Sequence, residues 1–192
     1  MSNQKALALT FVFLTAAVGP LNARIGETTL QCVARYGPPK DTPTSKIMDK
    51  NSPLIEGAIH HIYEYQGWRI RAAFLQLDGT AVRIEYSKIP AVGVSATVKD
   101  YELRAIMTAN TPAEMAWTPI AYDNPDSPNK GIAKAAEPFV SVGQKMWQRT
   151  DGALLWSRGD IIIRLELPVA REYERELKAK KDQKARASVP QF

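Results

Sequence analysis

The chain has 192 residues, of which 45% are hydrophobic and 23% charged, and its formal net charge is +5. These values are typical of a folded protein and exclude a wholly disordered chain. Seven basic and four acidic residues lie between positions 171 and 186, so the excess charge sits at the end of the chain; we therefore expect no nucleic-acid partner, which would require a basic stripe on the folded body.

The first 23 residues have the pattern of a cleavable signal peptide. Lys5 precedes an apolar run over residues 6–18, which is too short to span a bilayer, since a spanning helix needs about 20 apolar residues. Ala23 supplies the small residue that a cut before Arg24 requires. We expect an exported protein, periplasmic or extracellular, that is soluble after cleavage and has no transmembrane span in its mature chain.

A helix is predicted within residues 26–39. Thr28 can cap it, and Gln31 completes a capping box. Gly37 and the prolines after it end the helix. One face of this helix is formed by Thr29, Cys32, Val33 and Tyr36.

Three strands follow, over residues 59–65, 68–77 and 80–87, and Asp78-Gly79 predicts a type I′ hairpin turn. Alternation along these strands separates two faces. The face predicted to be core carries Trp68, Ile70, Ala72, Phe74, Val82, Ile84 and Tyr86. The face predicted to be solvated carries Arg69, Arg71, Arg83 and Glu85.

The second half repeats this order of elements. A helix is predicted over residues 98–109, a short strand over 115–118, strands over 145–149, 153–157 and 161–167, and a last helix from 169 to about 181, with a charged tail to 192. The proline-rich loop 119–143 is long enough for a binding or lid role, or is merely mobile. The sequence thus predicts an α+β domain over 24–168, with helices on one face of an antiparallel sheet, in two pseudo-repeats (about 24–90 and 95–168).

The opening of the first half resembles the SmpA/OmlA-like domain. Five residues of that motif are present at their places, with Cys32 in an apolar slot: Gly26, Thr28, Gln31, Gly37 and Pro39. The aromatic strand 63–68 and the hairpin 74–79 extend the resemblance to residues 26–87. It implies a non-catalytic interaction module of the bacterial envelope, and the beta-lactamase inhibitor protein superfamily contains a doubled version. No lipobox precedes Cys32, so a lipid anchor does not follow.

Few residues suggest chemistry. Cys32 with His60 or His61 would make a thiol hydrolase, whereas a cysteine on the apolar stripe of a helix is typical of a core. The two histidines point to opposite strand faces without further ligands nearby, so we expect no metal, no cofactor and no catalytic residue. The tripeptide 158–160, Arg-Gly-Asp, matches an adhesion signal and equally fits a turn.

The candidate partner-binding residues are arginines and tryptophans, which are enriched at interface hot spots. They are Arg69, Arg71, Arg83, Trp147, Arg149, Trp156 and Arg164. The arginines fit equally well on a solvated sheet face with cross-strand ion pairs. We expect Trp147 and Trp156 to be the exposed tryptophans.

The sequence favours an exported, non-catalytic protein-interaction or envelope-assembly module with an unknown protein partner. Two alternatives stay open. One is an envelope hydrolase using Cys32. The other is a structural envelope protein whose C-terminal helix makes a weak contact with anionic lipid.

Overall fold

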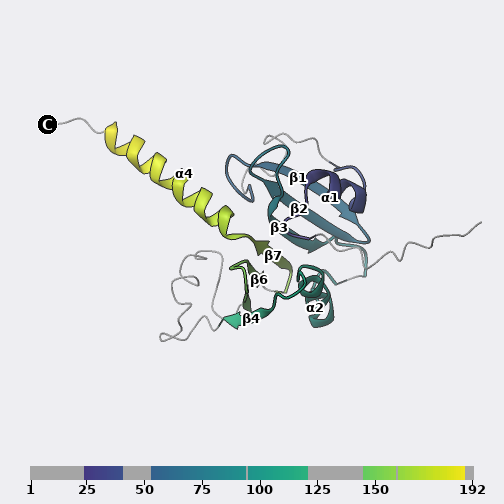
Figure 1. Ribbon diagram of the computed structural model, residues 1–192. Coiled ribbons are helices and arrows are strands. Elements are labelled where there is room, and N and C mark those ends of the chain that lie inside the picture. The colour runs from purple at the N-terminus through teal and green to yellow at the C-terminus, as the bar shows by residue number, and fades with distance from the viewer. Residues whose placement is uncertain (1–23, 41–52, 94, 121–144, 159, 189–192) are drawn as a thin grey trace, which may run out of the picture.

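The computed structural model describes residues 24–40, 53–93, 95–120, 145–158 and 160–188, which Figure 1 draws as a coloured ribbon. Within these ranges the chain forms three helices and one antiparallel sheet of seven strands. This confirms the predicted α+β class. The predicted signal peptide lies outside the described residues.

The first half contains one helix and three strands: α1 (Thr29–Tyr36), β1 (Ile59–Tyr65), β2 (Trp68–Phe74) and β3 (Ala81–Lys88). The second half contains one helix and four strands: α2 (Asp100–Ala109), β4 (Trp117–Ile120), β5 (Met146–Arg149), β6 (Leu154–Arg158) and β7 (Ile162–Glu166). The predicted loop 119–143 therefore begins two residues late, because Pro119 and Ile120 belong to β4; its remainder lies outside the described residues.

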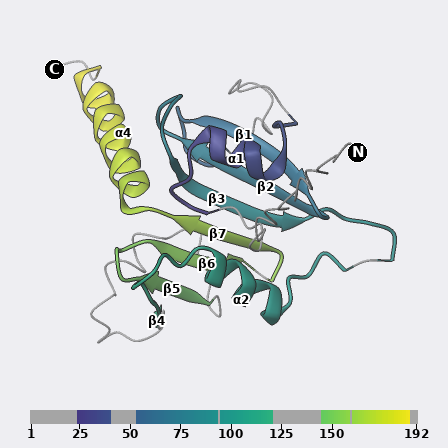
Figure 2. The same ribbon diagram turned by 45° about the vertical axis from the view of Figure 1, so that its right-hand side comes forward.

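The strand order is β1-β2-β3-β7-β6-β5-β4, so the last strands of the two halves, β3 and β7, pair in the middle of the sheet. Each half is a meander that starts at an outer edge and ends at this central seam. Figure 2 shows both helices in front of the sheet, α1 across the strands of the first half and α2 across those of the second.

Local chemistry accounts for the position of α1. The Thr28 hydroxyl accepts a hydrogen bond from the Gln31 amide at 3.3 Å, and the Gln31 side chain accepts one from the Thr28 amide at 2.8 Å. This is the predicted capping box. Gly37 ends the helix with a φ of +82°, a conformation that glycine adopts without steric cost.

A tight hairpin turn is present at Gln66-Gly67, between the first two predicted strands, whereas Asp78-Gly79 does not form the predicted type I′ turn. Gln66 and Gly67 both have positive φ, 48° and 80°, and Tyr65 pairs directly with Trp68. This is the geometry of a two-residue type I′ turn. The connection that contains Asp78-Gly79 is longer than two residues, because β2 ends at Phe74 and β3 starts only at Ala81.

We call the side of the sheet under α1 and α2 the helix-covered face. It carries the main hydrophobic core, a single cluster that contains residues of both helices and of strands from both halves. The helices contribute Cys32, Tyr36, Leu103 and Ile106, and the strands contribute Tyr63, Ile70, Ala72, Phe74, Ile84, Tyr86, Leu155, Ile163 and Leu165.

We call the opposite side the charged face, after Arg71, Arg83, Glu85, Arg164 and Glu166. The prediction that this side is solvated is wrong for its centre, since Arg83, Glu85 and Glu166 are only 2%, 3% and 3% exposed. They are flanked by two apolar clusters. One contains Leu54, Ile55, Ala58, Ala73, Val82 and Ala170, and the other contains Ile120, Met146, Leu154 and Trp156.

Val82 is a second correction. The sequence places it with Ile84 and Tyr86, but the pairing of β2 with β3 shifts register between Ala73 and Phe74. The extra residue of this irregularity turns Val82 toward the charged face, where it packs with Ala73.

The last helix, α4 (Pro168–Ala187), is longer than predicted and projects away from the sheet (Figure 1). A proline at its first position favours this start, because a helix leaves that amide without a partner in any case. Among the described residues, no helix combines the length and the apolar composition that crossing a membrane would require.

Candidate functional site

The charged face is crossed by a row of alternating charges. Arg71, Glu85 and Arg164 lie directly opposite one another on β2, β3 and β7. Glu85 accepts hydrogen bonds from Arg71 Nη1 at 2.8 Å and from Arg164 Nη2 at 2.5 Å. The Arg164 guanidinium also lies 5.8 Å from the ring centre of Trp156, the next residue in the same row. One buried carboxylate is thus held between two cations.

A second row connects the sheet to α4. Arg83 forms an ion pair with Glu166, its neighbour across the seam, and donates to the Leu54 carbonyl. It also binds both carboxylate oxygens of Glu174 in α4, at 2.8 and 2.6 Å. Arg171 completes the row by donating to Glu166 at 3.2 Å. These contacts provide the partners that buried charges need if burial is not to be strongly unfavourable.

The first two turns of α4 are packed on the charged face. Ala170 is fully buried, and Tyr173 packs with it on the apolar cluster. Two glycines with positive φ make room for this packing. A Cβ at Gly57 would lie 2.9 Å from the Tyr173 hydroxyl, and a Cβ at Gly152 would lie 3.3 Å from Pro168. The helix is therefore fixed at one end by apolar contacts, close backbone approach and ion pairs.

Beyond Glu174 the helix leaves the body. We call residues 175–187 the projecting helix; its side chains are exposed apart from the half-buried Leu177. It has six basic residues, Arg175, Lys178, Lys180, Lys181, Lys184 and Arg186, against two acidic ones, Glu176 and Asp182. Lys181 binds Glu56 at 2.5 Å in an exposed ion pair. The result is an exposed, positively charged helix whose first two turns are packed on the sheet.

Four of the candidate partner-binding arginines, Arg69, Arg71, Arg83 and Arg164, lie on the charged face, with different accessibility. The side chain of Arg69 is 48% exposed and pairs with Glu64 at 3.2 Å, whereas those of Arg71 and Arg164 are 19% and 14% exposed. Arg83 is buried, so the prediction that it is open to a partner is wrong. The reason is that α4 covers it with Glu174.

Trp156 is a similar correction. It is 3% exposed and belongs to the second apolar cluster of the charged face, so it is not one of the exposed tryptophans. Trp147 is half-buried on the other side of the sheet, where it packs against the main core and lines a hollow of about 270 Å³ beside α2. The structure therefore does not bring the two tryptophans together.

Arg149 is buried as well, at 4% exposed, and its side chain makes its contacts within the protein. It binds both carboxylate oxygens of Asp151 at 2.8 and 2.6 Å and lies 5.5 Å from the ring centre of Trp117. These hydrogen bonds from Arg149 lower the pKa of Asp151. Its third contact is the carbonyl of Asn110 at the end of α2.

Cys32 lies in the core of the helix-covered face and is 1% exposed. Burial raises the pKa of its thiol to about 12, and the neighbouring Glu27 carboxylate adds to the rise. A thiol with this pKa stays protonated at neutral pH, and the thiolate is the nucleophilic form.

The two histidines lie on opposite faces of β1, as predicted. His60 accepts a hydrogen bond from the Ile55 amide at 3.2 Å on the charged face, and burial lowers its pKa to about 4. His61 lies 3.3 Å from the Tyr63 hydroxyl in the main core, where burial also lowers its pKa. Within the described part of the chain, no three His, Cys, Asp or Glu residues form a group suited to holding a metal.

Two features of the projecting helix could be seen in the sequence, namely its basic residues and its helical pattern. The packing of the first two turns of α4 on the sheet could not be seen in the sequence, because Glu174 and Arg171 form their ion pairs with residues on the strands β3 and β7. Of the tripeptide 158–160, the glycine lies outside the described residues.

Comparison with known proteins returned no family model, no curated protein and no solved structure that matches this chain.

Proposed function

We propose that this protein is an exported, non-catalytic interaction module of the cell envelope that presents its projecting helix to an acidic surface on a partner protein. One observation carries the proposal: a 20-residue helix is fixed to the body by its first two turns, while the rest extends into solvent with an excess of positive charge. A helix that is polar on all sides buries little apolar surface, and one known use of such a helix is to bridge to a second body.

The packing of the first two turns of α4 on the sheet supports this role. Because Ala170, Tyr173 and Glu174 hold the start of α4, the projecting part has a defined direction relative to the sheet. A preorganised element loses less conformational entropy on binding than a flexible tail does. Clustered positive charge also accelerates association with an acidic partner at low ionic strength.

The composition of the helix favours a protein over a lipid surface. Helices that lie in a membrane interface need a broad apolar face as well as basic residues. Leu177 is the only large apolar residue within 175–187. Lipid contact is therefore the alternative that the experiment below must separate.

The high pKa and burial of Cys32 support a role without catalysis, because a hydrolase would need an accessible thiolate. Export is supported by the signal-peptide pattern of residues 1–23. We also propose that the first half is related to the SmpA/OmlA-like domain. Its support is the motif from Gly26 to Pro39, whose capping box and terminal glycine have the geometry that such a helix requires.

The test is crosslinking in the envelope fraction with the full mature chain and two variants. Both variants replace three exposed basic residues by glutamine, one set on the projecting helix and one on the body. The helix variant changes Lys180, Lys184 and Arg186, and the control changes Lys40, Lys99 and Arg104.

We expect the wild type and the control to give the same crosslinked partner protein, and the helix variant to lose it. Raising the salt concentration should weaken the contact, because exposed charges are screened. Loss of the partner in both variants, or in neither, would refute a role for the projecting helix. Binding to anionic vesicles without a protein crosslink would favour lipid contact instead.

A further inference from the structure

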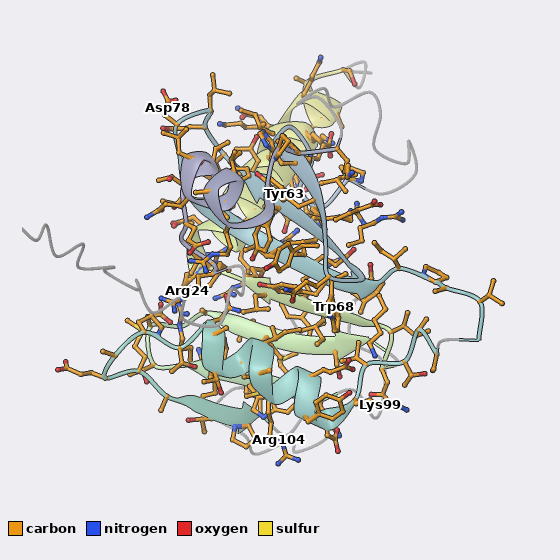
Figure 3. The ribbon with its side chains drawn as sticks, turned by 90° about the vertical axis from the view of Figure 1, so that its right-hand side faces the viewer. Arg24, Tyr63, Trp68, Asp78, Lys99 and Arg104 are labelled. Carbon is orange, nitrogen blue, oxygen red and sulfur yellow. The ribbon has the colours of Figure 1, made fainter. Side chains whose placement is uncertain are left out.

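The segment before α1 is fixed by main-chain contacts to both halves of the protein. The Ile25 amide donates to the buried Asn110 side chain at 2.8 Å, and the Gly26 amide donates to the Ala81 carbonyl at 2.9 Å. The Ala81 amide returns a hydrogen bond to the Glu27 carbonyl at 2.8 Å. Arg24 therefore has a defined position, which Figure 3 shows between the levels of α1 and α2.

The carboxylate of Glu27 lies next to this position. It is 8% exposed and accepts two hydrogen bonds from Arg35, at 2.5 Å from Nη2 and 3.1 Å from Nε. The backbone nitrogen of Arg24 lies 3.4 Å from Glu27 Oε2, the oxygen that also receives the longer Arg35 bond. A nearly buried carboxylate thus faces the main-chain nitrogen that immediately follows the predicted cut.

We propose that Glu27 is a binding site for the protein's own amino terminus, formed when the bond between Ala23 and Arg24 is hydrolysed. This inference rests on the proposed export. A signal peptidase adds water across the bond, which leaves a carboxylate on Ala23 and an α-ammonium group on Arg24. The amide that donated one weak hydrogen bond becomes a cation with three donors, at ion-pairing distance from Glu27.

The charges around the site are compatible with an ion pair between this ammonium group and Glu27. Glu27 carries one negative charge, and Arg35 is its present cationic partner. The further cations here are the guanidinium of Arg24 itself and that of Arg149, which lines a pocket of about 110 Å³ together with Arg24 and is paired with Asp151. The ammonium group of Arg24 would form an ion pair with the Glu27 carboxylate, which already forms one with Arg35. We therefore expect a moderate interaction, smaller than that of an isolated buried pair.

The consequence is a pH dependence of known sign. An ammonium group that gains a carboxylate partner has a higher pKa in the folded protein than its usual value of about 7.7–8.0. We expect an increase of about half to one unit, which corresponds to a roughly three- to tenfold larger folding equilibrium constant. This stabilisation is complete below the unfolded-state pKa and is lost as the pH rises through the folded-state pKa.

The test compares two complete mature chains, one starting at Arg24 and one starting at Ala23. The extra residue moves the ammonium group by one Cα–Cα step, about 3.8 Å, and restores the amide at Arg24. The α-amino pKa is measured from the pH dependence of its labelling, with mass spectrometry separating the labelled amino terminus from labelled lysines. Each chain is also made with Glu27→Gln, which keeps an acceptor and removes the charge.

We expect the higher pKa only in the chain that starts at Arg24 with Glu27 intact, and the same chain to show the stability increase below pH 8. Equal pKa values in the two chains, or no change with Glu27→Gln, would overturn the role of Glu27. Sequencing of the exported protein separates this from the premise, because a start other than Arg24 would refute the cleavage position whatever the engineered chains show.

Discussion

Residues at the centre of both sheet faces are buried, but different interactions stabilise the burial on each face. Leu165 and Glu166 are neighbours on β7, point to opposite faces, and are 0% and 3% exposed. The first packs among apolar side chains under the helices, whereas the second lies between Arg83 and Arg171. Burial on the helix-covered face is favourable in itself, while burial on the charged face depends on complete pairing.

This difference indicates which face determines the register in which β3 pairs with β7. On the helix-covered face, a slip of β7 against β3 would exchange one apolar pair for another. On the charged face, a slip of two residues brings Arg83 opposite Arg164 in one direction and Glu85 opposite Glu166 in the other. Like charges directly opposite each other are destabilising. We infer that the apolar face supplies the burial and the charged face selects the alignment.

Breaking the charged face should have the largest effect. Arg83→Met leaves Glu166 and the Leu54 carbonyl without their shared donor, and we expect a loss of about 3–5 kcal/mol in the free energy of unfolding, measured in urea. Changing Glu166→Leu in the same chain should recover much of the loss, since a matched apolar pair often replaces a buried ion pair. Arg69→Gln, which breaks a half-exposed pair, should cost no more than about 1 kcal/mol. Equal losses for Arg83 and Arg69 would contradict the contrast between buried and open pairs.

Breaking the helix-covered face should cost somewhat less. Leu165→Ala removes a fully buried side chain and leaves a cavity, for which we expect a loss of about 3 kcal/mol in urea unfolding. Leu77, which is 63% exposed, is the matched control, and Leu77→Ala should change stability by less than about 0.5 kcal/mol. Added salt should leave the Leu165 effect unchanged, and a strong salt dependence there would argue against the assignment of the two faces.

Acid should act on the charged face through His60. Its ring is neutral in the folded protein because burial, with the charges of Arg71 and Arg83, lowers its pKa to about 4. The unfolded chain binds this proton below about pH 6.5, so stability falls as the pH decreases from 6.5 to 4, by about 2–3 kcal/mol in total. His60→Gln keeps an acceptor for the Ile55 amide and should flatten the curve in this window. An unchanged pH profile would show that His60 is not buried in its neutral form.

Disturbing the contact between Gly57 and the start of α4 should have the smallest effect on stability, and Gly67 provides a matched control. Gly57 and Gly67 have φ values of +78° and +80°, so alanine should cost about 1 kcal/mol of backbone strain at either position. Only Gly57 also faces the Tyr173 hydroxyl. We expect Gly57→Ala to lose about 1 kcal/mol more than Gly67→Ala in thermal unfolding, and Tyr173→Phe to remove that difference. Equal losses without Tyr173→Phe would mean that the contact does not position α4.

Local signals predicted most of the elements, and long-range contacts account for the errors. The capping box at Thr28 and the alternation along β2 and β3 depend on neighbours in the chain, and both are present as expected apart from the face of Val82. The pairing of β3 with β7 joins residues such as Arg83 and Glu166 that no local pattern connects.

The predicted binding residues were misplaced for the same reason. Alternating Arg and Glu along a strand are the usual signature of a solvated face, and nothing local to Arg83 indicates that α4 and the segment with Leu54 will cover it. Trp156 was expected to be exposed because it lies near a turn, but its row across the sheet buries it beside Met146.

The pairing of β3 with β7 has a consequence for folding. Until β7 pairs with it, β3 is the open edge of the first half, and an open strand edge can pair with other chains and lead to aggregation. Arg83 and Glu85 lie on this strand, and charged side chains at an open edge discourage pairing with a second copy. We infer that the charges that select the register of the finished sheet also protect the partly folded chain from aggregation.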